Sequence, residues 1–213
     1  IMYSQIKDNT LIIAPHADDE VLGVGGTTNK LLSNNIDTHV IVCGTRKTDI
    51  QSDVNNALSA YTTATILPFI DEHYYESYRY MLSAIESVYL KIKPGVVYIP
   101  NVSDFNQDHK CVHSICEIVT RRYQKHNPNM IIMYEVPSST TQSYDNNFKC
   151  NLYETLTQKD LDYKISTMSK YSTEMRQYPN PRSPEGLITY AKFRGMECNS
   201  IYAEGFNIIY KKQ

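Results

Sequence analysis

The chain has 213 residues, a length that fits one domain with a sizeable core, and its formal net charge is −2. This near balance leaves no excess of basic residues of the kind that nucleic-acid binding needs. No apolar stretch approaches the ~20 residues that a transmembrane helix requires. We therefore expect a single domain over residues 1–213, with no nucleic-acid partner and no transmembrane segment.

Cysteine usage indicates the redox compartment. The five cysteines are an odd number, and no two of them form a Cys-x-x-Cys pair. This pattern argues against a disulfide framework and against a thiolate zinc site, and it is typical of a reducing compartment. We expect a cytoplasmic protein.

Short apolar runs alternate along the chain with segments of helical periodicity. Strands are predicted at residues 10–14, 39–43, 65–69, 96–100, 130–134 and 206–210. Helices are predicted at residues 21–32, 53–61, 75–92, 108–123, 159–172 and 184–193. This alternation predicts an α/β protein with a mostly parallel sheet and helices on both faces. Ligands bind such sheets beyond the carboxyl ends of the strands.

A histidine and three consecutive carboxylates follow the first predicted strand, in the sequence Pro15-His16-Ala17-Asp18-Asp19-Glu20. Ionised groups are costly to bury unless something compensates their charge, so such clusters usually face a cation, a cavity or solvent. One reading is a cation site. The other is compensation of a helix dipole, with the carboxylates at a helix N-terminus and His16 as a hydrogen-bonded loop residue.

A second cluster follows the predicted strand at 96–100, in the sequence Asp104-Phe105-Asn106-Gln107-Asp108-His109. Both clusters fall at carboxyl ends of strands, so we expect them to meet in one crevice. Carboxylate and imidazole ligands without thiolates suit a catalytic Zn²⁺ or a similar divalent metal. His16, Asp19 and a histidine near position 109 would supply three ligands, and Asp18 would be free to accept a proton from water.

The spacing of His109 and His113 places both on one helix face, as in zinc-binding His-x-x-x-His pairs, so spacing alone allows both as ligands. Lys110 stands where metalloproteases of that pattern carry Glu, which argues against a protease. A helix that begins near Asp108 should point its N-terminus at the crevice, and this favours His109 alone.

Residues 15–20, with Leu22-Gly23-Val24-Gly25-Gly26-Thr27 after them, resemble the signature of the PIG-L/LmbE-like N-acetylglucosamine deacetylases. Residues 104–109 are similar to that family's second metal motif. Segments 134–140, 181–185 and 202–206 also resemble family blocks in the same order, so the resemblance extends from about Leu11 to Tyr210.

The resemblance implies a Rossmann-like three-layer sandwich and a deacetylase that uses one zinc ion, or another divalent metal. It implies His16, Asp19 and His109 as the metal ligands, Asp18 as the general base and no ligand role for His113.

Two positions depart from the family pattern. Ala17 stands where the family usually has Pro, which changes little for the ligands. Asn106 stands where many members carry a His that handles charge at the reacting carbonyl. We expect Asn106 to donate a hydrogen bond to the developing oxyanion, but an amide cannot give up a proton, so the general acid stays open.

These features predict hydrolysis of the N-acetyl or another N-acyl group of an amino sugar, a sugar nucleotide or a sugar conjugate. Arg46 and Asp104 are expected to contact the substrate, although a solvent-facing Arg46 fits the sequence equally well, and the polar stretch 138–151 is expected to form the cleft rim. Two alternatives remain. One is a non-catalytic sugar- or nucleotide-binding Rossmann-like module, suggested by the glycines at 23–26, and the other is a metal-dependent esterase acting on an acylated sugar.

Overall fold

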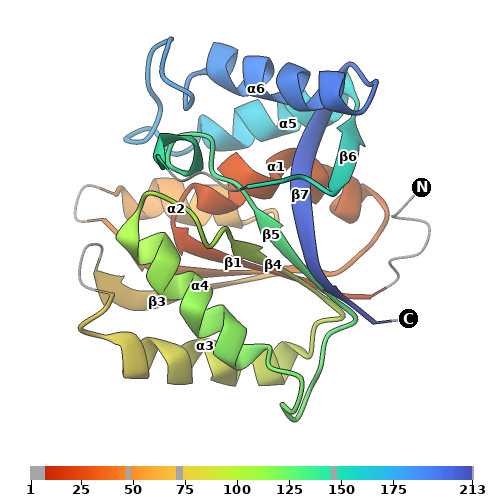
Figure 1. Cartoon of the computed structure of the whole chain (residues 1–213). Coiled ribbons are helices and arrows are strands. Elements are labelled where there is room, and N and C mark those ends of the chain that lie inside the picture. The colour runs from red at the N-terminus through yellow and green to blue at the C-terminus, as the bar shows by residue number, and fades with distance from the viewer. Residues whose placement is uncertain (1–7, 47–48, 71–73, 145–147, 213) are drawn as a thin grey trace.

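The computed structural model describes residues 8–46, 49–70, 74–144 and 148–212. These residues form a seven-stranded sheet with helices on both faces (Figure 1). The strands are β1 (Thr10–His16), β2 (Thr38–Thr45), β3 (Thr63–Ile70), β4 (Val96–Pro100), β5 (Met130–Tyr134), β6 (Leu152–Leu156) and β7 (Tyr202–Lys211). The helices are α1 (Asp19–Ser33), α2 (Gln51–Leu58), α3 (Tyr78–Ile92), α4 (Gln107–Val119), α5 (Gln158–Met168) and α6 (Pro184–Glu197), with a 3₁₀ turn, η1 (Thr140–Gln142).

The strand order is β3-β2-β1-β4-β5-β7-β6. The first five of these strands pair in parallel, whereas β7 runs antiparallel to both of its neighbours. The predicted α/β class with a mostly parallel sheet is therefore confirmed. None of the described helices combines the length and the apolar character that a membrane span would need.

The sequence did not predict β6, and it predicted β7 as the shorter range 206–210. β6 lies at the edge of the sheet, and its central Glu154 is buried in an ion pair with Lys30 of α1. A charged residue at an inward position hides the alternation by which a strand is recognised. The 138–151 stretch includes η1, and its residues 145–147 lie outside the described part of the chain.

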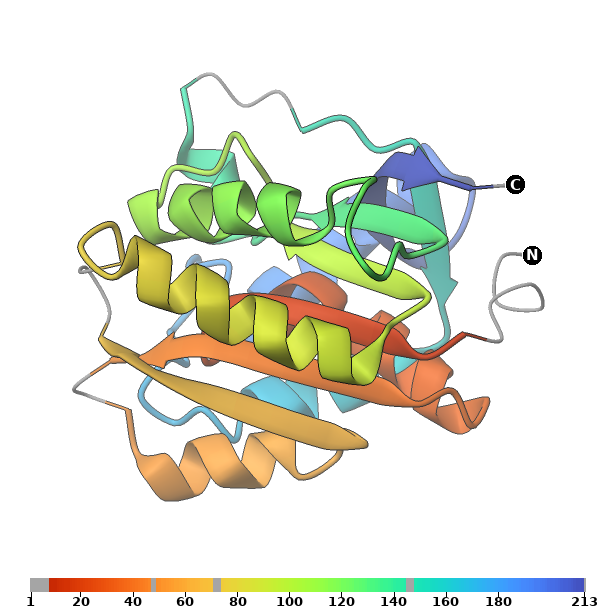
Figure 2. The ribbon, with the colours of Figure 1, turned by 90° about the horizontal axis from the view of Figure 1, so that it is seen from below.

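Successive residues of β1 supply two cores, one on each face of the sheet, because strand side chains alternate. Leu11 and Ile13 join a cluster with α3 and α4, and Ile12 joins a cluster with α1, α2 and α6. Figure 2 shows α3 and α4 lying together across one face. The near-continuous apolar run of β1 reflects burial on both faces.

Helix α1 approaches the sheet closely because its glycines leave room. A Cβ on Gly23 would lie 2.2 Å from the buried ring of Tyr134, and one on Gly26 would lie 2.5 Å from Leu156. The helix is also tied to β7, where Glu204 accepts hydrogen bonds from the backbone N–H groups of Gly26 and Thr27 at 2.9 and 2.8 Å. These contacts fix the position of α1 against the sheet.

β1 and β4 are parallel neighbours at the centre of the sheet, but their chains leave to opposite faces, into α1 and α4. This is the switch point of an open α/β sheet, where a crevice forms beyond the carboxyl ends of the strands. Both polar motifs of the sequence lie there.

Candidate active site

The turn between β1 and α1 holds Asp18 in a backbone conformation that L residues rarely adopt, with φ 124° and ψ −28°. Such a conformation costs roughly 1–3 kcal/mol and persists where the surroundings fix it, commonly at functional sites. The N–H of Asp18 donates to Glu20 Oε2 at 3.1 Å, and its carbonyl accepts from Val21 and Leu22. The turn thus sets the direction of the Asp18 side chain.

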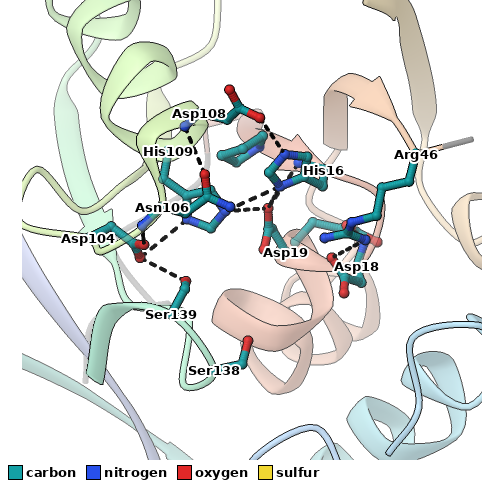
Figure 3. A network of polar contacts seen from close by, with 12 residues as sticks. His16, Asp18, Asp19, Arg46, Asp104, Asn106, Asp108, His109, Ser138 and Ser139 are labelled. Carbon is teal, nitrogen blue, oxygen red and sulfur yellow. Dashed lines mark hydrogen bonds and ion pairs between the residues drawn. The ribbon is translucent and has the colours of Figure 1, made fainter. Parts of the chain in front are cut away.

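Three donor atoms from β1, α1 and α4 form a compact triangle (Figure 3). Asp19 Oδ2 lies 3.1 Å from His16 Nδ1 and 3.1 Å from His109 Nε2, and the two ring nitrogens are 3.3 Å apart. A tetrahedral zinc with bonds of about 2.0–2.1 Å separates neighbouring nitrogen and oxygen ligands by about 3.3 Å. The triangle therefore has the dimensions of three zinc ligands.

The electrostatics of the triangle also favour a cation. Burial alone would raise the pKa of the Asp19 carboxyl, but His109 and His16 hold that pKa well below its usual range. Burial opposes the charge of His109, yet Asp19 and Asp104 raise the pKa of its ring to about 9. Asp19 Oδ1 is buried without a hydrogen-bond partner among the described residues. A divalent cation would compensate this buried negative charge, so the donor set fits the metal that the sequence predicts.

Each ring of the triangle has a further carboxylate behind it. His16 Nε2 lies 3.3 Å from Asp108 Oδ2, and His109 Nδ1 lies 3.2 Å from Asp104 Oδ2 (Figure 3). Carboxylates in this position orient metal-binding histidines and fix which ring nitrogen faces the metal. The arrangement leaves Nδ1 of His16 and Nε2 of His109 for the cation.

Asp104, predicted as a substrate contact, is fully buried. Its Oδ2 accepts hydrogen bonds from Ser139 Oγ at 3.0 Å and Thr140 Oγ1 at 2.6 Å, and its Oδ1 accepts from the N–H of Asn106 at 2.8 Å. Together with His109, these partners occupy both oxygens. The geometry thus favours a role in orienting His109 over a direct contact with the substrate.

Asp18 faces a different environment from its neighbour Asp19. Its carboxylate lies 3.2 Å from Arg182 and 3.7 Å from Arg46, and Glu174 pairs with both arginines. Burial raises the pKa of Asp18 to about 6, against the lowering effect of Arg182 and Arg46. Arg46 does not face solvent, since its side chain is 18% exposed and pairs with the acidic groups beside it.

Glu20 completes the acidic motif but points away from the triangle. It is fully buried, and its Oε1 accepts a hydrogen bond of 2.5 Å from the hydroxyl of Tyr171. Burial raises the pKa of Glu20 to about 8, although the Tyr171 hydrogen bond acts in the opposite direction. Glu20 thus links the turn of Asp18 to the segment between α5 and α6.

Asn106 is the N-cap of α4, where its Oδ1 accepts the N–H of Asp108 at 2.8 Å. Its amide N–H groups make no hydrogen bond within the described chain, so they are available to a ligand. His113 lies one turn further along α4, and its Nδ1 lies 2.8 Å from the carbonyl oxygen of Pro100. His113 is therefore engaged elsewhere and does not belong to the triangle.

A cleft of about 800 Å³ opens beside these residues, which is within the usual range of ligand sites. Its inner lining includes Asp108 and Arg182, which contact His16 and Asp18. Towards solvent the lining carries the exposed aromatic side chains of Tyr75, Phe105 and Tyr144 and the half-buried hydroxyl side chains of Ser138, Ser139 and Ser143.

Sequence reasoning missed Tyr171, Glu174 and Arg182 as parts of the site. Arg182 lies in a segment that resembled a family block, which was the one available signal. Tyr171 falls within the helix predicted at 159–172, where a tyrosine is indistinguishable from an ordinary packing residue. Glu174 lies in the irregular stretch after it, where a lone carboxylate is indistinguishable from a solvent-facing one.

Residues 11–120 match the model of the PIG-L family, described as GlcNAc-PI de-N-acetylase. The chain belongs to the PIG-L family, as its motifs predicted. None of the curated proteins matches it.

Several solved structures share the fold of this chain at low sequence identity. An N,N'-diacetylchitobiose deacetylase from Pyrococcus horikoshii has a TM-score of 0.75 and 18% identity, over 94% of this chain and 83% of that one. A deacetylase in the biosynthesis pathway of teicoplanin has a TM-score of 0.76 and 13% identity, over 93% and 96%. GalB, the 4-carboxy-2-hydroxymuconate hydratase from Pseudomonas putida KT2440, has a TM-score of 0.73 and 15% identity, over 96% and 98%. At these identities the likeness concerns the fold alone.

The assignment of the triangle can be tested by removing one histidine at a time. We expect His109→Ala to lose stoichiometric zinc on dialysis, because it removes one of three donors. We expect His113→Ala to retain the zinc, because its ring contacts the Pro100 carbonyl. Metal analysis of both proteins, with circular dichroism to show that they are folded, decides the point. Loss of metal from a folded His113 variant would revive the paired-histidine alternative.

Proposed function

We propose that the protein is a zinc-dependent deacetylase that hydrolyses the N-acetyl, or another N-acyl, group of an amino sugar or a conjugate of one. The observation that carries the proposal is the His16–Asp19–His109 triangle with Asp18 beside it, in a chain of the PIG-L family. Two proteins that share the fold add support, since both are deacetylases.

His16, Asp19 and His109 would hold the metal. A divalent cation at that position supplies Lewis-acid polarisation of the acyl carbonyl and lowers the pKa of water. Because Asp104 and Asp108 hold the two rings from behind, these ligands would keep their geometry when the substrate enters.

Asp18 would accept the proton of the attacking water. Its pKa of about 6 leaves it ionised at neutral pH, while burial makes it more basic than an exposed aspartate. The same carboxyl, once protonated, would carry a proton for the leaving nitrogen, because Asn106 has none to give. Asn106 would donate its amide N–H to the developing oxyanion.

The cleft volume of about 800 Å³ is at the large end of the usual range for ligand sites, and we take this as support for a conjugate over a free amino sugar. We also propose that Arg46 contacts the substrate. We propose zinc as the native metal and the cytoplasm as the location of the protein.

The proposal is tested by a panel of N-acetyl and O-acetyl sugars, with free amine and acetate read by mass spectrometry and metal content measured on the same preparation. We expect amide hydrolysis that chelation abolishes and zinc restores. Protein without a stoichiometric divalent ion would favour a binding module, and cleavage confined to the O-acetyl sugars would favour an esterase.

The base is tested by Asp18→Asn, which keeps the size of the side chain but removes its proton affinity. We expect the variant to keep the metal and to lose at least ~100-fold in kcat, a typical scale for loss of a general base. Single-turnover kinetics together with metal analysis give both quantities. Near wild-type turnover would show that Asp18 is not the base.

The role of Asp104 is tested by Asp104→Asn. We expect zinc affinity to fall about 10–100-fold, as is typical when the partner of a metal-binding histidine is removed, with little change in KM at saturating zinc. Asp162→Asn on the exposed face of α5 is the matched control. A raised KM with unchanged zinc affinity would restore the original expectation that Asp104 contacts the substrate.

A further inference from the structure

We propose that Glu20 and Tyr171 are positioning residues that lock Asp18 in its unusual backbone conformation and so aim its carboxylate into the site. The proposal rests on the proposed function for the role of Asp18 as base. Its geometric part concerns the backbone of Asp18 and can be tested without any activity.

The first step is the backbone of Asp18, whose φ of 124° is unfavourable for any residue with a side chain. Its carbonyl is fixed by the N–H groups of Val21 and Leu22, as the start of α1 requires. On the other side, its N–H is held by Glu20 Oε2 at 3.1 Å. Without that acceptor the peptide before Asp18 could rotate towards negative φ, and the side chain would swing with it.

The second step is the carboxylate of Glu20, which lies at 0% exposure. Burying a polar carboxyl group is costly unless it is hydrogen-bonded, and an apolar side chain would pack there at lower cost. Its two oxygens accept hydrogen bonds from the N–H of Asp18 and from the hydroxyl of Tyr171, at 3.1 and 2.5 Å. The Tyr171 hydrogen bond directs one oxygen, and the rigid carboxylate plane then directs the other at Asp18.

The third step is the origin of Tyr171, in the α5–α6 segment (residues 169–183). The same segment supplies Arg182, which lies 3.2 Å from the Asp18 carboxylate, and Glu174, which pairs with Arg182. One segment therefore holds both the backbone and the side chain of Asp18. It lies outside residues 11–120, which match the family model, so Tyr171 comes from a different part of the chain than Glu20 and the motif that it orients.

The experiment compares Tyr171→Phe with Tyr163→Phe in the full chain. Tyr163 is a matched control, because its buried hydroxyl, unlike that of Tyr171, makes no hydrogen bond to Glu20. In crystal structures we expect Tyr171→Phe to give Asp18 a relaxed or doubled backbone conformation, and Tyr163→Phe to leave φ unchanged. An Asp18 that keeps φ near 124° in Tyr171→Phe would overturn the proposal, whatever the protein hydrolyses.

The kinetic arm uses the wild-type substrate. We expect Tyr171→Phe to lower kcat about 10–100-fold, the scale of a small misplacement of a reacting group, with KM and zinc content unchanged. Glu20→Gln can accept only one of the two hydrogen bonds and should show a similar loss. The double variant should lose little more than either single one, because the two residues act as a unit. The proposal would be overturned if both single variants kept the wild-type kcat, or if their losses multiplied in the double variant. An inactive wild-type protein would count against the proposed function alone.

Discussion

The contact between His16, Asp19 and His109 is the interaction on which the rest of the site depends. Three donor atoms lie within 3.3 Å of one another in a buried crevice. Removing these polar and charged groups from water is unfavourable, and a bound cation would offset that cost. The fold brings the three residues together, because β1 and β4 are neighbouring strands and the segments that follow them turn to opposite faces of the sheet. A crevice at that point receives the end of one strand and the first turn of the helix after the other.

Asp18 and Asp19 are adjacent in sequence, yet their surroundings separate them chemically. Asp19 sits between two imidazole rings, and its pKa is held well below its usual range, although burial alone would raise it. Asp18 sits against two arginines that Glu174 already engages, and burial raises its pKa to about 6. One carboxylate is thereby suited to remain charged as a ligand, and the other to exchange a proton. Two carboxylates with opposite shifts in one site are the usual mark of divided roles.

The sequence predicted those site residues that lie together in short contiguous motifs. His16, Asp18, Asp19 and His109 lie in two short motifs, and strand–helix alternation sufficed to predict that the motifs meet. It could not predict the antiparallel edge strand β6, whose inward Glu154 breaks the apolar pattern. Nor could it assign Asp104, because the distinction between a substrate contact and a partner of His109 depends on η1, where Thr140 and its neighbour Ser139 occupy that carboxylate. Contacts of this kind join distant segments and leave no local signal.

The fold by itself does not decide the reaction, since a hydratase and two deacetylases share it at similar TM-scores. What can decide it is the set of groups that the crevice presents, and here these come from two sources. Residues before 120 supply the cation ligands, and the α5–α6 segment supplies the arginine and the tyrosine that act on Asp18 and Glu20. The first set defines where a carbonyl would be polarised. The second defines how a proton acceptor is held beside it, and a change confined to that segment would alter the chemistry while leaving the metal ligands intact.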